Sequence, residues 1–305
     1  MRVLVLTEKE KEAKPFVNAM KAIGIKANAS QLIKISLVSK HKNTLIKSID
    51  EDIPKYDAVF LQARTNLAPF IEPLIDSLQD KNIYCNALPG SYYLAVNEPY
   101  KFVNLCVNNV PTPRNLISGS GKNIEKVSKN VSYPLVAKSF LGKDVQQSTI
   151  INSDKELENF VKSIKTKIDG FVLREFVDDC VISCVVIGEK VFAIDRRSGN
   201  SCVTDLSKGR SYKPTEKEKA VAIHAAKASG LSIARVDLVK GLVIAVDPEI
   251  PTQSFNKICS VDLEMHIANF FMDKINEIGV KRRPSDELRD IVSKLHRTII
   301  GSFFK

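Results

Sequence analysis

Two aspartates in the stretch IARVDLVKGLVIAVDPEIPTQSFN, residues 233–256, are the first candidates for chemistry in this chain. Asp237 and Asp247 each lie in a short β-rich run, and the two runs flank the dipeptide Lys240-Gly241. A carboxylate among apolar neighbours is costly unless a cation meets it. The pattern therefore predicts a β-hairpin that binds a divalent metal ion, for which carboxylate oxygens are suitable ligands.

The turn between the two runs decides whether the aspartates act together, because strand side chains alternate between the faces of a sheet. With a two-residue turn, Asp237 would lie opposite Ile244 and face away from Asp247. With a three-residue turn, Asp237 would lie opposite Ala245 and share a face with Asp247. We expect the shared face, in which like charges repel unless a cation lies between them.

Basic side chains follow two other apolar runs. Lys138 ends the run 133–138, and Arg196 and Arg197 follow the run 190–195 directly. A guanidinium donates in a fork that suits a phosphoryl or carboxylate group. Strand alternation lets only one of the two arginines point toward a site, and the alternative is one exposed arginine and one salt bridge.

Composition sets the broad class of the protein. With 305 residues, 44% apolar and 26% charged, the chain has the length and balance of a soluble protein of two domains. It has no run of about 18 apolar residues and no secretory signal, so we expect a cytoplasmic protein without a membrane segment. The net charge of +10 suits an anionic partner, but it is spread along the chain, which makes nucleic acid unlikely. The six cysteines are expected to be free thiols in a reducing cytosol.

Alternating strands and helices must position these residues. Residues 1–95 predict a small parallel sheet wrapped by helices, without the glycine fingerprint of dinucleotide binding. The predicted strands there are 2–6, 57–63 and 82–86, and the helices are 8–23 and 69–78. Further on, the predicted strands are 133–138, 171–176, 181–187 and 190–195, and the helices are 98–108, 154–165, 215–228, 263–277 and one from about 285.

Taken in order, six segments resemble the ATP-grasp ligases and, among them, the RimK-type amino-acid ligases. They are NEPYKFVNLCVNNVPTPRNLI (97–117), YPLVAKSFLGKD (133–144), FVLREFV (171–177), VVIGEKVFAIDRRS (185–198), ARVDLVKGLVIAVD (234–247) and SVDLEMHIANFFMDKI (260–275). The resemblance implies an α/β fold, α+β in its C-terminal part, with a pre-ATP-grasp domain of a small parallel sheet. It implies four parts: 1–95, subdomain A at 96–168, subdomain B at 169–282 and a C-terminal helix at 283–305.

The resemblance also implies a function and roles for residues. The function is an ATP-dependent carboxylate–amine ligase that adds an amino acid, glutamate being commonest in the family, to a carboxylate acceptor through an acylphosphate. The acceptor is a small molecule or a protein tail, the cofactors are ATP and Mg²⁺ with Mn²⁺ as a substitute, and a homo-oligomer is compatible with the apolar C-terminal run. The implied residues are Arg196 and Arg197 for catalysis, Lys101, Lys138, Lys143, Glu175, Phe176, Val177 and Asp178 for the nucleotide, and Asp237 and Asp247 for the metal.

The chain departs from the family pattern at the metal and phosphate positions. Ala245 stands where the family has a glutamate, and Asp247 where it has an asparagine. The loop 142–147, glycine-rich in the family, contains one glycine. Two alternatives to the ligase therefore stay open: a non-catalytic nucleotide- or partner-binding module, and a basic RNA-associated protein.

Overall fold

A computed structural model of the chain describes residues 1–41, 43–119, 131–139, 148–163, 170–198 and 201–281, without the side chains of residues 40, 43, 198 and 279–281. The chain forms two compact units. Among the described residues, the first unit comprises positions 1–62, 77–85 and 262–281, and the second comprises positions 63–76 and 86–261. The four-part division expected from the sequence stays a prediction.

A four-stranded parallel sheet organises the first unit, as the alternation of strand and helix signals predicts. Its order is β2 (Lys26–Gln31), β1 (Arg2–Thr7), β5 (Ala58–Gln62) and β6 (Tyr84–Cys85). Helix α1 (Glu10–Ala22) contacts helix α9 (Leu263–Lys281). The ring of Phe60 lies 4.8 Å from that of Phe16 and 5.7 Å from that of Phe271, measured between centroids. These aromatic side chains join sheet and helices in one core.

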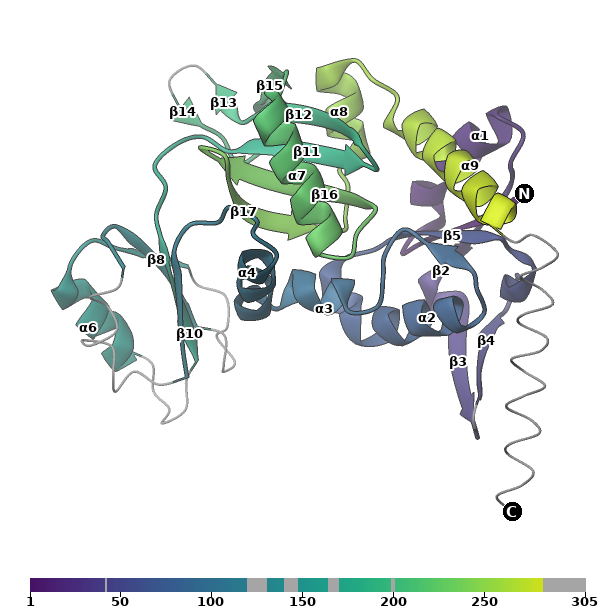
Figure 1. Ribbon diagram of the computed structural model, residues 1–305, viewed down its shortest axis with the longest axis horizontal. Helices are drawn as coiled ribbons and strands as arrows, with labels where there is room; N and C mark the ends of the chain where they lie inside the picture. The colour runs from purple at the N-terminus through teal and green to yellow at the C-terminus, as the bar shows by residue number, and fades with distance from the viewer. Residues whose placement is uncertain (42, 120–130, 140–147, 164–169, 199–200, 282–305) are drawn as a thin grey trace. The chain divides into compact units, whose positions relative to one another are not determined.

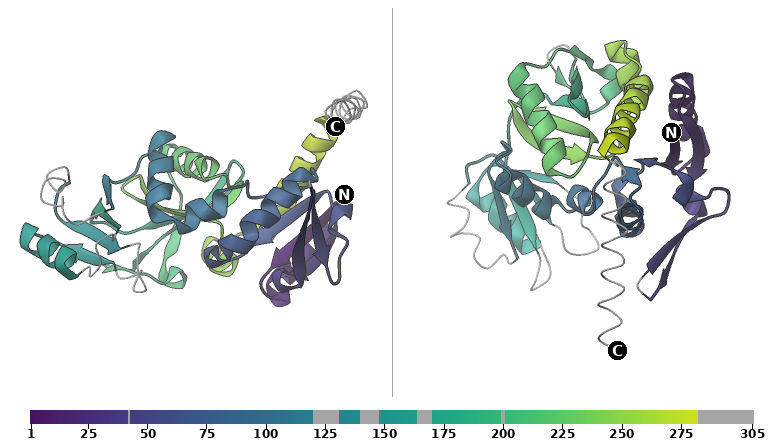
Figure 2. Two further views of the ribbon diagram at one scale, coloured as in Figure 1. Left: turned by 90° about the horizontal axis from the view of Figure 1, so that it is seen from below. Right: turned by 45° about the vertical axis from the view of Figure 1, so that its right-hand side comes forward.

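A two-stranded antiparallel ribbon, β3 (Ile35–Lys40) and β4 (Asn43–Ser48), extends away from that sheet (Figure 2). The sequence prediction assigned no element to this segment. Between β5 and β6 the chain forms helix α2 (Ala68–Asp80), close to its predicted range.

The second unit contains two antiparallel sheets (Figure 1). The first has the order β7 (Asn115–Ser118), β10 (Phe171–Glu175), β8 (Leu135–Ser139) and β9 (Thr149–Ile151). Buried apolar side chains of this sheet, among them Leu135 and Leu173, form a core with Leu157 of helix α6 (Asp154–Ser163). The opposite face of the same strands carries Lys138 and Arg174 together with apolar side chains such as Val172.

The second sheet has the order β15 (Arg210–Tyr212), β12 (Lys190–Asp195), β11 (Ile182–Ile187), β16 (Ile233–Val239) and β17 (Leu242–Asp247). Helix α7 (Glu216–Ala228) packs against β16, and Thr215 and Glu218 form a capping box at its N-terminus. Among the described residues this unit also contains the α-helices α3 (Ser91–Val96), α4 (Glu98–Val107) and α8 (Thr252–Cys259), and a short ribbon consists of β13 (Arg197–Ser198) and β14 (Ser201–Cys202).

The turn of the β16–β17 hairpin has two residues, so the expected three-residue turn is wrong. Lys240 and Gly241 both have positive φ, 50° and 76°, and Val239 pairs with Leu242. A β-bulge then leaves Ile244 unpaired, and from there Asp237 lies opposite Ala245. The bulge shifts the register by one residue. Asp237 and Asp247 therefore share a face as expected, but because of the bulge and not because of the turn.

The expectation of six free thiols is wrong for one pair of cysteines. Cys180 and Cys202 form a disulfide, whereas Cys85, Cys106, Cys184 and Cys259 are not disulfide-bonded. The two bonded residues are 22 positions apart, with strands β11 and β12 between them. Nothing in the sequence indicated this disulfide, because Cys202 comes close to Cys180 only when the β13–β14 ribbon folds back.

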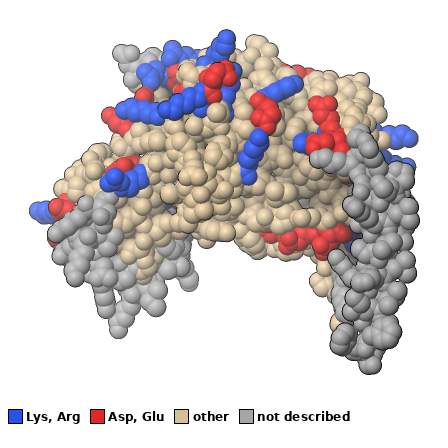
Figure 3. All heavy atoms as spheres, viewed as in Figure 1, with Lys and Arg blue, Asp and Glu red and all other residues tan. Residues whose placement is uncertain are grey.

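No helix among the residues that the structure describes is long and apolar enough to cross a membrane. On the face in Figure 3, lysine and arginine side chains stand next to aspartate and glutamate side chains. Two predictions lie outside the described residues: Lys143 with its loop, and the C-terminal helix.

Candidate active site

Glu98, on the first turn of α4, holds two basic side chains of the neighbouring sheet. Lys138 Nζ lies 2.6 Å from Glu98 Oε2, and Arg174 Nη1 lies 3.3 Å from Glu98 Oε1. Lys138 and Arg174 share a face because Lys138 pairs with Val172, two residues before Arg174. The predicted phosphate ligand Lys138 is thus one member of a charged cluster, not a lysine in solvent.

Lys101 adds a third cation to this cluster. Its Nζ donates to the Ala95 carbonyl oxygen at 3.2 Å. Burial lowers the pKa of Lys101, and the charges of Glu98 and Asp247 oppose that shift. The interaction with Asp247 relates the cluster at Glu98 to the β16–β17 hairpin.

A second link between the two sheets is made by Arg174. Its Nη1 donates to the carbonyl oxygen of Ile244 at 3.4 Å, and its guanidinium lies 5.1 Å from the ring centroid of Phe102. Ile244 is the bulged residue, so its backbone is not paired with β16. Arg174 thereby holds the bulge that sets the register of Asp237.

Phe176 and Val177, which the resemblance implies for the nucleotide, have only part of their backbone available for hydrogen bonds to a ligand. The Phe176 N–H donates to the Pro134 carbonyl oxygen at 2.8 Å, and the Val177 carbonyl accepts from Asp179 N at 3.1 Å. Within the described residues, the Phe176 carbonyl and the Val177 N–H have no hydrogen-bond partner, and they are the groups that adenine could pair with. Glu175 Oε1 lies 3.9 Å from Arg114 Nε.

Asp178, which the resemblance implies for the nucleotide, is exposed, and so is its neighbour Asp179. Asp179 Oδ1 accepts from Arg197 Nη2 at 2.7 Å and from Cys180 N at 2.7 Å, which leaves Asp178 as the ribose candidate.

Arg196 and Arg197 point in different directions, as strand alternation predicts. Arg196 lies on the inner face of the sheet, where its Nη2 is 3.1 Å from Asp237 Oδ2 and its Nε donates to Ser183 Oγ at 2.8 Å. Arg197 binds Asp179 and lies 4.0 Å from Asp195 Oδ2. The Arg196 side chain is 16% exposed and that of Arg197 is 43% exposed. Of the two, Arg196 is the one that adjoins the hairpin carboxylates.

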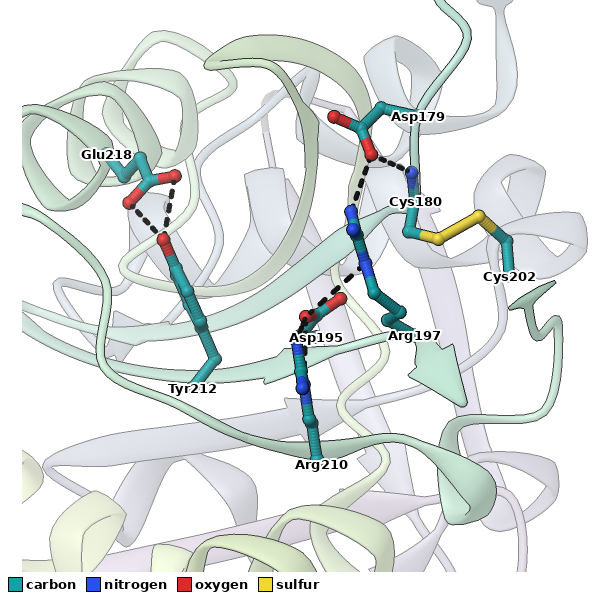
Figure 4. A network of polar contacts seen from close by, with 8 residues as sticks. All are labelled: Asp179, Cys180, Asp195, Arg197, Cys202, Arg210, Tyr212 and Glu218. Atoms are coloured by element: carbon teal, nitrogen blue, oxygen red, sulfur yellow. Dashed lines mark hydrogen bonds and ion pairs between the residues drawn. A yellow bond between two sulfur atoms is a disulfide. The ribbon is translucent and has the colours of Figure 1, made fainter. Parts of the chain in front are cut away.

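Arg197 belongs to a separate network beside the disulfide (Figure 4). Asp195, nearly buried, also accepts from Arg210 Nη2 at 2.8 Å, so this carboxylate holds two guanidinium groups. The network ties the segment after Val177, through Asp179, to the end of β12. A catalytic role for Arg197 stays a prediction, and its observed contacts are structural ones.

The hairpin aspartates are already bound to arginine side chains. Asp247 Oδ2 lies 3.1 Å from Arg235 Nη2, and Asp237 Oδ1 lies 3.6 Å from Arg235 Nε. Asp237 Oδ1 also accepts from Ser183 Oγ at 2.7 Å. No cluster of three or more His, Cys, Asp or Glu side chains within the described part of the chain could hold a metal ion. As they stand, these carboxylates do not fit a divalent cation, since a guanidinium lies between them.

The sequence prediction did not list Glu98, Arg174, Arg235 and Ser183 among the site residues. Arg235 could have been found from strand period alone, because it lies two residues before Asp237 and must share its face. Glu98 gave no such signal, since an acid on the first helical turn is common for reasons of helix stability alone.

A family model of the RimK-like ATP-grasp domain matches residues 99–271. The chain belongs to the RimK-like ATP-grasp family. Membership confirms the ATP-grasp fold and the predicted class of ATP-dependent C–N ligase. Among the most similar relatives is a "probable alpha-L-glutamate ligase" of Mannheimia succiniciproducens, 24% identical over 235 residues that cover 73% of this chain and 79% of the relative.

Solved ATP-grasp structures share the fold. The ligase PsnB, in a complex with a minimal precursor, Mg and ADP, aligns with a TM-score of 0.68 at 13% identity and covers 90% of this chain and 97% of its own. A RimK domain ATP-grasp protein from Sphaerobacter thermophilus aligns with a TM-score of 0.65 at 16% identity, covering 88% and 99%. The ATP-grasp fold implies the use of ATP and a divalent metal ion.

Proposed function

We propose that this RimK-like chain joins the amino group of an amino acid, glutamate first, to a carboxylate acceptor at the expense of ATP. The relatives named probable alpha-L-glutamate ligases support glutamate. The precursor peptides in the related ligase structures support a carboxylate on a peptide or protein tail, although a small-molecule acceptor fits the same chemistry.

The observation that carries the proposal is the convergence of Lys101, Lys138 and Arg174 around the single carboxylate of Glu98. Three cations face one anion there, so the cluster has charge left for a triphosphate. Lysine and arginine side chains are the usual protein ligands of phosphate groups. The Phe176 carbonyl and the Val177 N–H follow directly after β10, on which Arg174 lies, and would pair with adenine.

In the proposed reaction the acceptor carboxylate attacks the γ-phosphorus, the bond to the β-phosphate oxygen breaks, and ADP leaves. The amine then attacks the acyl carbon and loses a proton. The bond between the acyl carbon and the bridging oxygen breaks, and phosphate leaves with that oxygen and the electron pair. Arg196 would lie against the negative charge that develops on the transferring group, since a guanidinium stabilises such charge strongly where water is excluded. Asp237 and Ser183 would orient Arg196 through the two contacts that they already make.

The test is ADP release from the full chain with ATP, Mg²⁺ or Mn²⁺, and a panel of amino acids and carboxylate acceptors. We expect release that depends on both substrates and falls at least about tenfold in Lys138→Met, which removes one charge-assisted phosphate contact worth about 1.5–3 kcal/mol. Lys162→Met is the matched control, because Lys162 lies exposed on α6, 3.6 Å from Glu158. The proposal would be refuted if no combination in the panel released ADP and Lys138→Met bound ATP as tightly as wild type.

A second candidate is a nucleotide-binding module without catalysis. The specific observation in its favour is that Glu98 and Arg235 already form ion pairs with side chains that phosphate and metal would need. Calorimetry separates the two candidates: a module would bind ATP equally with and without Mg²⁺, whereas a ligase would bind it in a Mg²⁺-dependent way.

A further inference from the structure

Arg235 lies where a hairpin of this kind would hold a cation. Its guanidinium contacts both aspartates, with Nη2 at 3.1 Å from Asp247 Oδ2 and Nε at 3.6 Å from Asp237 Oδ1. The Arg235 side chain is 23% exposed and that of Asp237 is 9% exposed. The two carboxylates thus share one partly buried positive charge.

The register of the strands fixes this arrangement. Arg235 pairs directly with Asp247 across the hairpin, and it lies two residues before Asp237 on the same face of β16. The bulge at Ile244 brings Asp237 and Asp247 onto one face, so it also brings both of them to Arg235. The arginine is part of the strand and does not depend on a loop for its position.

The charges and donors at the hairpin are already balanced. Asp237 Oδ2 has Arg196 Nη2 at 3.1 Å and Asp237 Oδ1 has Ser183 Oγ at 2.7 Å. Asp247 Oδ1 accepts from Glu249 N at 2.9 Å, and its other oxygen from Arg235. Two negative charges therefore meet two positive ones, and an added divalent cation would lie directly beside a guanidinium.

One atom does not fit this balance. Arg235 Nε is buried and has no hydrogen-bond partner among the described residues. A guanidinium held by two carboxylates would normally use Nε as a donor. Charge therefore sets the position of the Arg235 guanidinium more than hydrogen-bond geometry does. This is expected for a group that occupies the place of a more compact cation.

We propose that the guanidinium of Arg235 takes the cation position of this hairpin, so that Asp237 and Asp247 bind a divalent cation only when the charge at residue 235 is removed. The inference rests on the proposed function, since it concerns the cation of that site. A divalent ion used by the enzyme would then arrive bound to the nucleotide phosphates, since Mg²⁺ bound to phosphates needs only one or two protein ligands.

The test is a titration of the nucleotide-free full chain with Mn²⁺. Binding is measured as the decrease of the electron paramagnetic resonance signal of free Mn²⁺. Wild type and R235K keep a positive charge and should bind no Mn²⁺ at the hairpin. R235Q has a shorter, polar side chain without the charge, and it should bind Mn²⁺ at least about tenfold more tightly than R235K, since a unit charge about 4 Å away acts strongly even when solvent screens it. The double variant R235Q/D237N should lose that binding.

Two results would overturn the proposal. The first is Mn²⁺ binding by wild type that D237N abolishes, a comparison that needs no Arg235 variant. The second is a folded R235Q that binds Mn²⁺ no better than R235K, with R235M as a second neutral variant and far-ultraviolet circular dichroism as the check of folding. Neither result uses turnover, so failure of the ligase assay and failure of this inference are distinguishable.

Discussion

Glu98 is the side chain whose charge most directly opposes nucleotide binding in the proposed site. Its two oxygens lie against Lys138 and Arg174, at 2.6 Å and 3.3 Å, where phosphate oxygens would have to lie. The substitution Glu98→Gln keeps the shape and removes the charge. We expect it to bind ATP more tightly than wild type does, which is unusual for a change at the centre of a site.

The size of the gain follows from the geometry. A phosphate bound by Lys138 would lie roughly 5 Å from the Glu98 carboxylate, where two unit charges repel by about 3 kcal/mol at an effective dielectric constant of about 20. Glu98 is 21% exposed and Lys138 is 34% exposed, so water screens part of this repulsion. We expect about 1 kcal/mol to remain, which corresponds to about a fivefold change in the dissociation constant.

The assay is isothermal titration calorimetry of the full chain with a non-hydrolysable ATP analogue and Mg²⁺. The gain should shrink as ionic strength rises, because salt screens partly exposed charges. Glu158→Gln is the control, since Glu158 is an exposed acid on α6 with its own lysine partner. If Glu98→Gln folded normally and bound the analogue more weakly than wild type, Glu98 would be needed to position the basic side chains, and the reasoning from charge competition would be refuted.

Three further outcomes are expected. Denatured, unreduced protein should react with iodoacetamide at four cysteines, and six labels without reductant would contradict the Cys180–Cys202 bond. Because burial lowers the pKa of Lys101 from 10.5, the folded state binds fewer protons than the unfolded state between the lowered pKa and 10.5. The free energy of unfolding should therefore rise with pH across that window, and Lys101→Met should flatten the slope in urea titrations. Glu72→Gln should lower the free energy of unfolding by about 1–3 kcal/mol in urea, since buried Glu72 accepts from the backbone N–H groups of Gly90 and Tyr92 at 2.6 Å and 2.5 Å; no loss would contradict this capping role.

The fold was predictable from the sequence where hydrophobic period and chain order carried the information. Strands β1, β5 and β10 to β12 and the capped helix α7 lie close to their predicted ranges, because their signals are local. The ribbon of β3 and β4 was missed, since its polar, lysine-containing strands lack a clear alternation of buried and exposed residues. The disulfide was missed because Cys202 reaches Cys180 only through the return of the β13–β14 ribbon.

The β16–β17 hairpin shows most clearly that turn type alone does not predict which side chains share a face. The positive φ of Lys240 and Gly241 fits the common two-residue turn, and by that rule Asp237 should face away from Asp247. The bulge at Ile244 reverses the result, and it is held by Arg174 from another sheet. No pattern within the hairpin reports a contact made 70 residues away in the chain.

The partners of the charged residues were likewise set by tertiary contacts. Lys138, Arg196, Asp237 and Asp247 lie among charged groups as predicted, but each already has an ion-pair partner inside the protein. Sequence reasoning looked for ATP and a metal ion as the counter-charges. The structure supplies Glu98 and Arg235 in addition. Glu98 lies on α4, which adjoins the site only in the folded chain, whereas Arg235 lies on β16 two residues before Asp237.

The central claim is ligation through an acylphosphate, and an isotope-transfer measurement tests it most directly. The acceptor carboxylate is labelled with ¹⁸O, the full chain is incubated with ATP, Mg²⁺ and the amino acid, and the released inorganic phosphate is analysed by mass spectrometry. Because the carboxylate oxygen that attacks phosphorus leaves with the phosphate, the account predicts one ¹⁸O atom in each phosphate released. ADP formed together with unlabelled phosphate would contradict it.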